Sequence, residues 1–210
     1  MTSGRPFFVL LGPDGAGKSS VMGRLAALLP EWRLVSTDSA FVAPEHALIP
    51  RLRRDLQDHL LPGLGTAYSV DFLASVLQTA VVHLRDQVRG RDPRVPLLVD
   101  SYYYKILAKC RMAGVRDSRM YDWWRGFPQP DRVVYLDVSP EAAWRRRGDG
   151  TGLNSLEYEG DHGDWAGFER YQKDLGKLLL EEVRDLPVTV LPEQPGADRA
   201  AEAVRKVLTA

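Results

Sequence analysis

A glycine-rich loop directly after a short apolar run constrains the fold of this chain more than any other feature of its sequence. The apolar run is Phe7-Phe8-Val9-Leu10-Leu11, and the loop is Gly12-Pro13-Asp14-Gly15-Ala16-Gly17-Lys18-Ser19-Ser20. The loop matches G-x-x-x-x-G-K-[ST], a pattern that requires a strand before it and a helix after it. Backbone N–H groups in such a loop point at phosphate oxygens, and the helix adds its positive N-terminal end. The sequence therefore predicts a strand, loop and helix that hold a polyphosphate.

The residue types in this loop predict individual roles. Lys18 would reach the β and γ phosphates of a nucleotide, and the Ser19 hydroxyl would coordinate Mg²⁺. The alternative is a glycine-rich turn with a surface lysine. The residues expected to bind the nucleotide are Gly12, Asp14, Gly15, Ala16, Gly17, Lys18, Ser19 and Ser20.

The bulk composition limits the classes of partner. The 210 residues suit one domain, since single cores stop growing at about 250–300 residues. The 28 basic and 28 acidic residues cancel, so net charge does not indicate a nucleic acid polymer. Cys110 is the only cysteine, which excludes an internal disulfide and fits a reducing compartment. Neither a signal peptide nor an apolar run of about 18 residues is evident, so we expect a cytoplasmic protein without a membrane span.

Apolar runs alternate with helical periodicity along the chain. Strands are expected at residues 7–11, 34–36, 96–100, 132–138 and 187–191. Helices are expected at about 18–29, 45–62, 69–90, from 140 onward, 164–185 and 197–209. This alternation predicts an α/β fold, a five-stranded parallel sheet with helices on both faces, as one domain over residues 1–210. Ligands of such sheets bind at the carboxyl ends of the strands.

Two acidic residues follow expected strands at that edge. Asp100 ends the third strand and is a candidate to hold Mg²⁺ opposite Ser19, or else the N-cap of a helix beginning near Tyr102. Asp38 follows the second strand, where it could take a proton from a phosphoryl acceptor or simply order a turn with Ser36 and Ser39.

A run of three arginines, Arg145-Arg146-Arg147, leads into a glycine-rich stretch that ends at Gly163. Arginines carried by a closing flap stabilise the charge of a transferring phosphoryl group and exclude water. At most two of the three can point inward together, and we expect Arg145 and Arg147 to be catalytic on a mobile lid at about 145–163. The alternative is that basic residues favour a helix C-terminus.

The residues after Asp100 and those of the long helical region would form the wall of an acceptor pocket. Tyr102 and Tyr103 could stack on an acceptor or bond to it, although core packing explains them equally well. Phe72 and Gln78 are the candidates from the helix expected at 69–90.

Several of these stretches together resemble the thymidylate kinase family of P-loop nucleoside-monophosphate kinases. They are Gly12 to Ser20, Asp100-Ser101-Tyr102, and the run from Pro130 through Asp137-Val138-Ser139-Pro140-Glu141 to Arg145 and Arg147. The resemblance implies the P-loop kinase fold, ATP and Mg²⁺, phosphoryl transfer to a small molecule, and a homodimer. Ser101 stands where the family has an arginine that grips the phosphate of the acceptor, which argues against dTMP as the acceptor.

We therefore expect an ATP:Mg²⁺ phosphotransferase that acts on a nucleotide-like or nucleoside-like small molecule. An unphosphorylated hydroxyl compound is the alternative acceptor, with Asp38 as the base. A GTP-dependent switch would carry Asn-Lys-x-Asp, whereas the only asparagine is Asn154. A third possibility is a regulatory module whose phosphate loop has degenerated. The intact Lys18, Ser19 and Asp100 argue against it.

Overall fold

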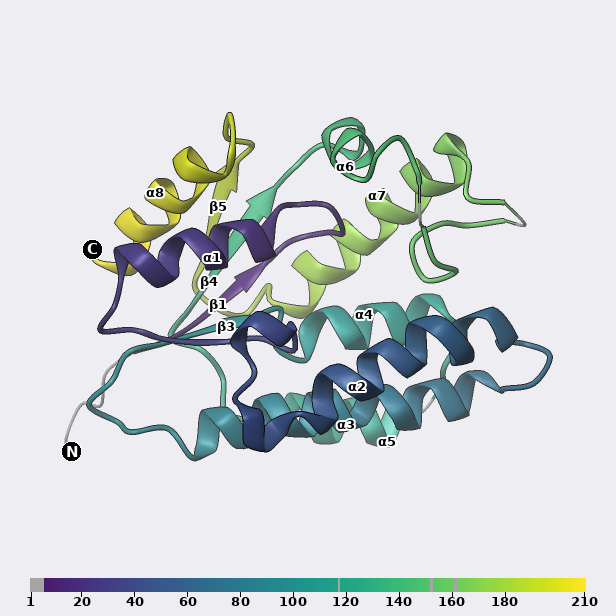
Figure 1. Cartoon of the computed structure of the whole chain (residues 1–210), viewed down its shortest axis with the longest axis horizontal. Coiled ribbons are helices and arrows are strands. Elements are labelled where there is room, and N and C mark those ends of the chain that lie inside the picture. The colour runs from purple at the N-terminus through teal and green to yellow at the C-terminus, as the bar shows by residue number, and fades with distance from the viewer. Residues whose placement is uncertain (1–5, 117, 152, 161) are drawn as a thin grey trace.

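The computed structural model describes residues 6–116, 118–151, 153–160 and 162–210 (Figure 1). Residues 152 and 161 of the expected lid lie outside this description, as do residues 1–5 of the expected domain. The strands are β1 Phe7–Leu11, β2 Arg33–Val35, β3 Leu97–Asp100, β4 Arg132–Asp137 and β5 Val188–Pro192. All pair in parallel in the order β2-β3-β1-β4-β5, which confirms the predicted sheet.

Helices cover both faces of the sheet (Figure 1). The longer ones are α1 Lys18–Leu28, α3 Val70–Arg89, α7 Trp165–Glu182 and α8 Ala197–Leu208. The shorter ones are α2 Leu48–Asp55, α4 Tyr104–Met112, α5 Ser118–Arg125 and α6 Pro140–Arg146. Because β1 is buried throughout, its side chains alternate between two cores. Phe7, Val9 and Leu11 pack with α3, α4, α5 and α7, while Phe8 and Leu10 pack with α1 and α8.

The region between β2 and α3 differs from its prediction. In place of one helix at 45–62, the chain forms 3-10 turns at Ser39–Phe41 and Pro44–His46 and then α2. The helix continues beyond α2 as a π turn at Leu56–Leu60 and a 3-10 turn at Leu61–Gly63. Leu60, Leu61 and Leu73 form a small core with Leu156, which ties this region to α3 and to the segment after α6.

Two helices, α4 and α5, lie between β3 and β4, where only a possible helix near Tyr102 is expected. Helix α4 buries Tyr104, Leu107, Ala108 and Cys110, so one face of it belongs to the core. The N-cap position of α4 is Tyr103, so the reading of Asp100 as an N-cap is wrong. Asp100 lies before the helix, at the edge of the sheet where β1 also ends.

Candidate active site

The loop after β1 has the backbone geometry that phosphate binding needs. Gly15 and Gly17 have φ of +73° and +86°, in the left-handed region that glycine tolerates best. Gly15 also packs so tightly against α6 that an added Cβ would lie 2.9 Å from the Ala143 Cβ and carbonyl oxygen. Ser19 and Ser20 are exposed in the first turn of α1. The loop therefore presents its amides and these hydroxyls at the N-terminus of an 11-residue helix.

Lys18 is buried and folds back over the loop. Its Nζ donates to the carbonyl oxygens of Gly12 and Pro13, at 2.8 and 2.9 Å. Burial lowers the pKa of Lys18, and the neighbouring positive charge of Lys105 lowers it further. An anionic ligand would favour the charged form of this ammonium group.

Asp100 is fixed at the end of β3 by two serines. Its Oδ2 accepts a hydrogen bond from Ser36 Oγ at 3.0 Å, and its Oδ1 accepts one from Ser101 Oγ at 2.8 Å. The backbone turns sharply here, because Ser101 and Tyr102 have φ of +59° and +45°. Such left-handed conformations cost about 1–2 kcal/mol per residue and are tolerated where the surroundings enforce them. The buried ring of Tyr102 packs edge-on against Phe7 at 5.6 Å and supplies that enforcement.

Asp14 lies in a buried cluster that joins the loop to α4 and α7. Its carboxylate pairs with Lys105 Nζ at 2.6 Å and Lys109 Nζ at 2.8 Å, and its backbone N–H donates to Gln172 Oε1 at 3.0 Å. Burial alone would raise the pKa of Asp14, but the two ammonium groups outweigh it and hold the pKa well below its ordinary value. Burial lowers the pKa of Lys109 in turn.

These groups line a cavity of about 670 Å³. Its polar part is formed by the phosphate loop together with Thr37, Asp100, Ser101, Lys105 and Lys109. The opposite wall is aliphatic and comes from α2, the turns after it and α3, through Leu52, Leu56, Leu61, Val76, Leu77 and Leu84. A ligand in this cavity would place a polar group at the loop and an apolar body between α2 and α3.

A second, smaller cavity of about 160 Å³ lies on the other side of the loop. It is bounded by Gly17 and Val21 of the loop and α1, by Leu136 and Val138 at β4, and by Leu191 to Gly196 after β5. Arg146 lines both cavities. The phosphate loop therefore lies between the two cavities. A site for a phosphoryl donor and a site for a phosphoryl acceptor would need this arrangement.

The arginine run is arranged differently from the prediction. Arg146 donates to the carbonyl oxygens of Gly15 and Ala16, both at 3.4 Å, and to Glu193 at 3.1 Å. Arg147 pairs with the buried carboxylate of Glu157. Arg145 is exposed and is not among the described residues that line the cavity. The pair that faces inward is thus Arg146 and Arg147, and the assignment of Arg145 is wrong in its geometry.

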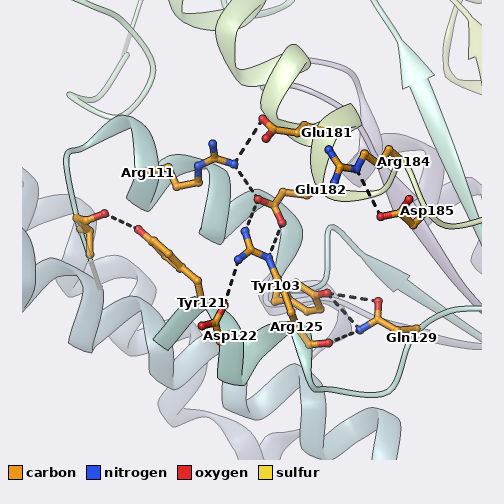
Figure 2. Close-up of polar contacts among 11 residues, drawn as sticks. Tyr103, Arg111, Tyr121, Asp122, Arg125, Gln129, Glu181, Glu182, Arg184 and Asp185 are labelled. Atoms are coloured by element: carbon orange, nitrogen blue, oxygen red, sulfur yellow. Dashed lines mark hydrogen bonds and ion pairs between the residues drawn. The ribbon is translucent and has the colours of Figure 1, made fainter. Parts of the chain in front are cut away.

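Three of the four predicted acceptor residues lie outside the cavity wall. Phe72 is 49% exposed and stacks on Tyr68. Gln78 is rotated by about 200° around α3 from Val76, which does line the cavity. The Tyr103 hydroxyl exchanges hydrogen bonds with the Gln129 side chain, as Figure 2 shows, and Tyr103 is not among the described residues that line the cavity. Tyr102 does line the cavity, although it is packed into the core.

Asp38 is also displaced from its predicted position as a base. Its carboxylate accepts a hydrogen bond from the Ala40 backbone N–H at 3.1 Å, caps the turn at Ser39–Phe41, and lies 3.9 Å from Arg53. Arg53 and Thr37 line the cavity, whereas Asp38 does not. The structure therefore favours the turn-ordering role that the sequence left open.

Sequence reasoning gave Ser36, Lys109 and Glu157 no role in a ligand site. It placed Arg146 in the lid run and Lys105 in the run after Asp100, but it singled out neither. A signal existed for the lysines, because their spacing of four residues places them on one face of any helix that follows Asp100. Glu157 and Ser36 carry no such signal, since their roles depend on strands and loops that meet only in the fold.

The oxygen donors of the site fit Mg²⁺. Among the described residues no three His, Cys, Asp or Glu side chains are grouped as a metal-binding cluster. Mg²⁺ in phosphate sites needs only one or two protein oxygens and keeps water and phosphate as its other ligands. The Ser19 hydroxyl and the Asp100 carboxylate line the same cavity and are hard oxygen ligands of this kind. No helix in the described part of the chain is long and apolar enough to span a membrane.

Comparison with known proteins agrees with this geometry. No family model matches the chain. A probable thymidylate kinase from Staphylothermus marinus is 29% identical over 157 residues, 73% of each chain. Two structures of deoxyadenosine kinase from M. mycoides, one with dCMP and a flexible dCDP and one with dATP, share the fold. Their TM-scores are 0.59 and 0.60, at 17% and 18% identity, over 97% and 98% of this chain and 98% and 100% of theirs. The chain therefore has the P-loop kinase fold of these two structures and is similar in sequence to a probable thymidylate kinase, which identifies it as a P-loop kinase.

Proposed function

We propose that this kinase transfers the γ-phosphoryl group of ATP to a nucleoside or nucleotide, with Mg²⁺ as its metal. The observation that carries the proposal is one cavity shared by the phosphate loop, Lys18, Ser19 and Asp100. The donor phosphates would lie against the loop amides and Lys18. The donor base would enter the smaller cavity between α1 and the segment after β5.

The charged side chains around the loop have distinct roles in this proposal. Ser19 and Asp100 would hold Mg²⁺, which neutralises charge on the phosphates when it is bound. Arg146 already contacts the loop and would exchange its bonds to Gly15 and Ala16 for a phosphate oxygen. Arg147, released from Glu157, would stabilise the transferring group.

The acceptor oxygen must approach in line with the leaving oxygen of the donor. Asp100 faces the cavity and is held by Ser36 and Ser101, so it can orient the acceptor as well as the metal. Asp38 lies behind Arg53 and would not act as the base.

The proposal includes a single kinase domain over residues 1–210, a lid at about 145–163, a cytoplasmic location and a homodimer. The lid rests on the position of α6 and its arginines beside the loop. The dimer rests on the family resemblance, and the location on the single buried cysteine.

Replacement of Lys18 by alanine tests the proposal. We expect Lys18→Ala to lower kcat/KM about 10²–10³-fold in an assay of ATP-dependent phosphorylation with deoxynucleosides, nucleoside monophosphates and other hydroxyl compounds as acceptors. Lys177→Ala is the control, because Lys177 is exposed on α7 and pairs with the exposed Asp174. Unchanged turnover in Lys18→Ala would show that the loop is not the donor site.

A further inference from the structure

Helix α2 carries an aliphatic stripe that the rest of the protein leaves partly uncovered. Ile49, Leu52 and Leu56 follow one another at spacings of three and four residues, so they share one face of this helix and its continuation. No residue of α2 is buried, and in the described part of the chain Ile49 and Leu52 belong to none of the hydrophobic cores. Both line the larger cavity. Apolar side chains that face a cavity and not a core favour a ligand with an apolar body.

Helix α3 faces this stripe with a second one. The two helices lie side by side (Figure 1). The residues that α3 contributes to the cavity are all aliphatic: Val76, Leu77, Ala80 and Leu84. Ile106 of α4 adds a further aliphatic side chain to the same cavity. A ligand body held between α2 and α3 would therefore meet hydrocarbon from three helices.

Few polar side chains reach this part of the cavity. Among the described residues of α2, the turns after it and α3, those that line the cavity with polar atoms are Arg53 and Gln57. Both are exposed, and Arg53 lies 3.9 Å from the carboxylate of Asp38. The edge of a nucleobase carries several donors and acceptors, and each one that is buried without a partner lowers affinity by about 5–150-fold. This wall therefore lacks buried polar groups that would pair with such an edge.

The polar groups of the cavity lie at its other end, where the chemistry takes place. Asp100 and the phosphate loop would meet the reacting oxygen of the acceptor there. That oxygen would bond to the γ phosphorus of ATP, the bridging P–O bond would break to leave ADP, and the proton of an attacking hydroxyl would pass through Asp100 to water. The reacting group and the body of the acceptor thus lie in different surroundings.

We propose that this site selects the acceptor by the apolar surface of its body and does not read the hydrogen-bonding edge of a base. The substrate class is a small alcohol, or its phosphomonoester, with an apolar ring or chain. Nucleosides and nucleotides belong to this class only through the shape of their bases. The inference rests on the proposed kinase function and names the property by which the same site chooses its acceptor.

Matched pyrimidine acceptors separate the two modes of recognition. Deoxyuridine and deoxycytidine have the same shape but different donors and acceptors on the base edge, so their kcat/KM values should agree within about tenfold. The methyl group of thymidine should raise kcat/KM about three- to fourfold above that of deoxyuridine. The difluorotoluene analogue of thymidine has the shape of thymidine without that polar edge, and it should equal or exceed thymidine. Each compound is assayed with ATP and Mg²⁺, as the nucleoside and as its 5′-monophosphate.

Variants of Leu52 and Gln57 test the wall itself. Leu52→Asn should raise KM for the difluorotoluene analogue about tenfold or more, because a polar group would then lie against its apolar ring. Leu52→Met conserves the volume and should stay within about threefold. Gln57→Leu extends the apolar wall and should raise kcat/KM for the analogue about two- to fourfold. Leu180→Asn is the control, because Leu180 is 42% exposed on α7 and is not among the described residues that line the cavity.

A calorimetric titration with AMP-PNP and Mg²⁺ distinguishes failure of this inference from failure of the proposed function, and thermal melts verify that the variants fold. If the wild-type protein does not bind AMP-PNP, or transfers phosphate to no acceptor, the proposed function fails. If phosphate is transferred but the analogue falls more than about tenfold below thymidine, or deoxyuridine and deoxycytidine differ by more than that, only the apolar selection is overturned. An unchanged KM in Leu52→Asn would overturn it too. So would a loss in Gln57→Leu confined to nucleosides with a polar edge, because Gln57 would then read the base.

Discussion

Asp100 is positioned by neighbours that lie far from it in sequence, and Ser36 is the clearest of them. Ser36 is buried, donates to Asp100, and accepts a hydrogen bond from the Asp38 backbone N–H at 3.1 Å. Groups that orient metal-binding carboxylates typically contribute 10–100-fold to affinity or activity. We expect Ser36→Ala to lower kcat about tenfold or more at fixed Mg²⁺ and to raise the Mg²⁺ concentration needed for half-maximal rate.

Ser39→Ala is the matched control, because Ser39 is exposed in the following turn. A titration of initial rate against Mg²⁺ measures both variants. A purely structural role for Ser36 would lower stability without moving the Mg²⁺ requirement, and that result would refute the positioning role.

We expect donor binding to depend on pH through the buried ammonium group of Lys18. Burial lowers its pKa to about 7 from an ordinary value of 10.5. Donor phosphates favour the charged form, so binding above pH 7 must take up a proton and must weaken as the pH rises. We expect the Kd of AMP-PNP with Mg²⁺ to rise by up to about tenfold per unit between pH 7 and 9.

Lys18→Arg stays charged over this whole range and should give a flat profile, whatever its absolute affinity. Calorimetric titrations at three pH values test both proteins. A flat profile for the wild type would mean that Lys18 remains charged in the free protein.

At the scale of residues, the sequence predicted those candidate site residues that a local motif or the end of a strand marks. Residues Gly12 to Ser20 and Asp100 could be found because a loop motif and a strand end are readable along the chain. Arg146 could not be distinguished from Arg145, since the turn that ends α6 decides which arginine faces inward. Tyr103 was assigned to the cavity by its proximity to Asp100, but the helix that begins at Tyr104 directs it to Gln129.

The contact between the phosphate loop and α6 couples two elements that are far apart in sequence. Gly15→Ala would force a Cβ to within 2.9 Å of Ala143 and also strain a φ of +73°. We expect it to lower the free energy of unfolding by about 2–5 kcal/mol, the sum of left-handed strain and overpacking. Gly17→Ala carries similar strain at φ +86° but meets only Arg146 Nη1, at 3.8 Å.

Urea unfolding compares the two variants directly. Gly17→Ala should cost only about 1–2 kcal/mol, because strain acts there without a clash. Equal losses in the free energy of unfolding would show that α6 shifts to make room for the added methyl group. In that case packing against α6 does not stabilise the loop.

Among the elements, strands were easier to predict than helices. The apolar strands of the sheet are buried on both faces, and their continuous apolar runs mark them clearly. The sequence offered a helix near Tyr102 only as an alternative role for Asp100, and it did not predict α5 at all. The helix expected at 45–62 changes into a π turn at Leu56, which periodicity cannot reveal.

At the scale of the molecule, Glu182 joins three helices of one face (Figure 2). Its side chain, only 5% exposed, accepts hydrogen bonds from Arg111 of α4 at 2.8 Å and from Arg125 of α5 at 2.7 and 3.0 Å. Removal of one partner from a buried ion pair is strongly destabilising, although both arginines here are partly hydrated. We expect Glu182→Ala to cost about 2–4 kcal/mol in the free energy of unfolding.

Glu181→Ala is the neighbouring control. Glu181 is 49% exposed and lies 3.6 Å from Arg111, so its loss should stay within about 0.5 kcal/mol. Chemical denaturation monitored by tryptophan fluorescence measures both. Similar midpoints would mean that the three helices are held by their apolar core alone.

The burial of Cys110 has a practical consequence for studying this kinase. The thiol lies within α4, directly after Lys109 in the sequence, and burial raises its pKa to about 12. A thiol in that state does not react with alkylating reagents until the helix opens. The alkylation rate of Cys110 therefore reports how often α4 opens. Ligands that stabilise this helix should lower that rate, and the experiment needs no added label.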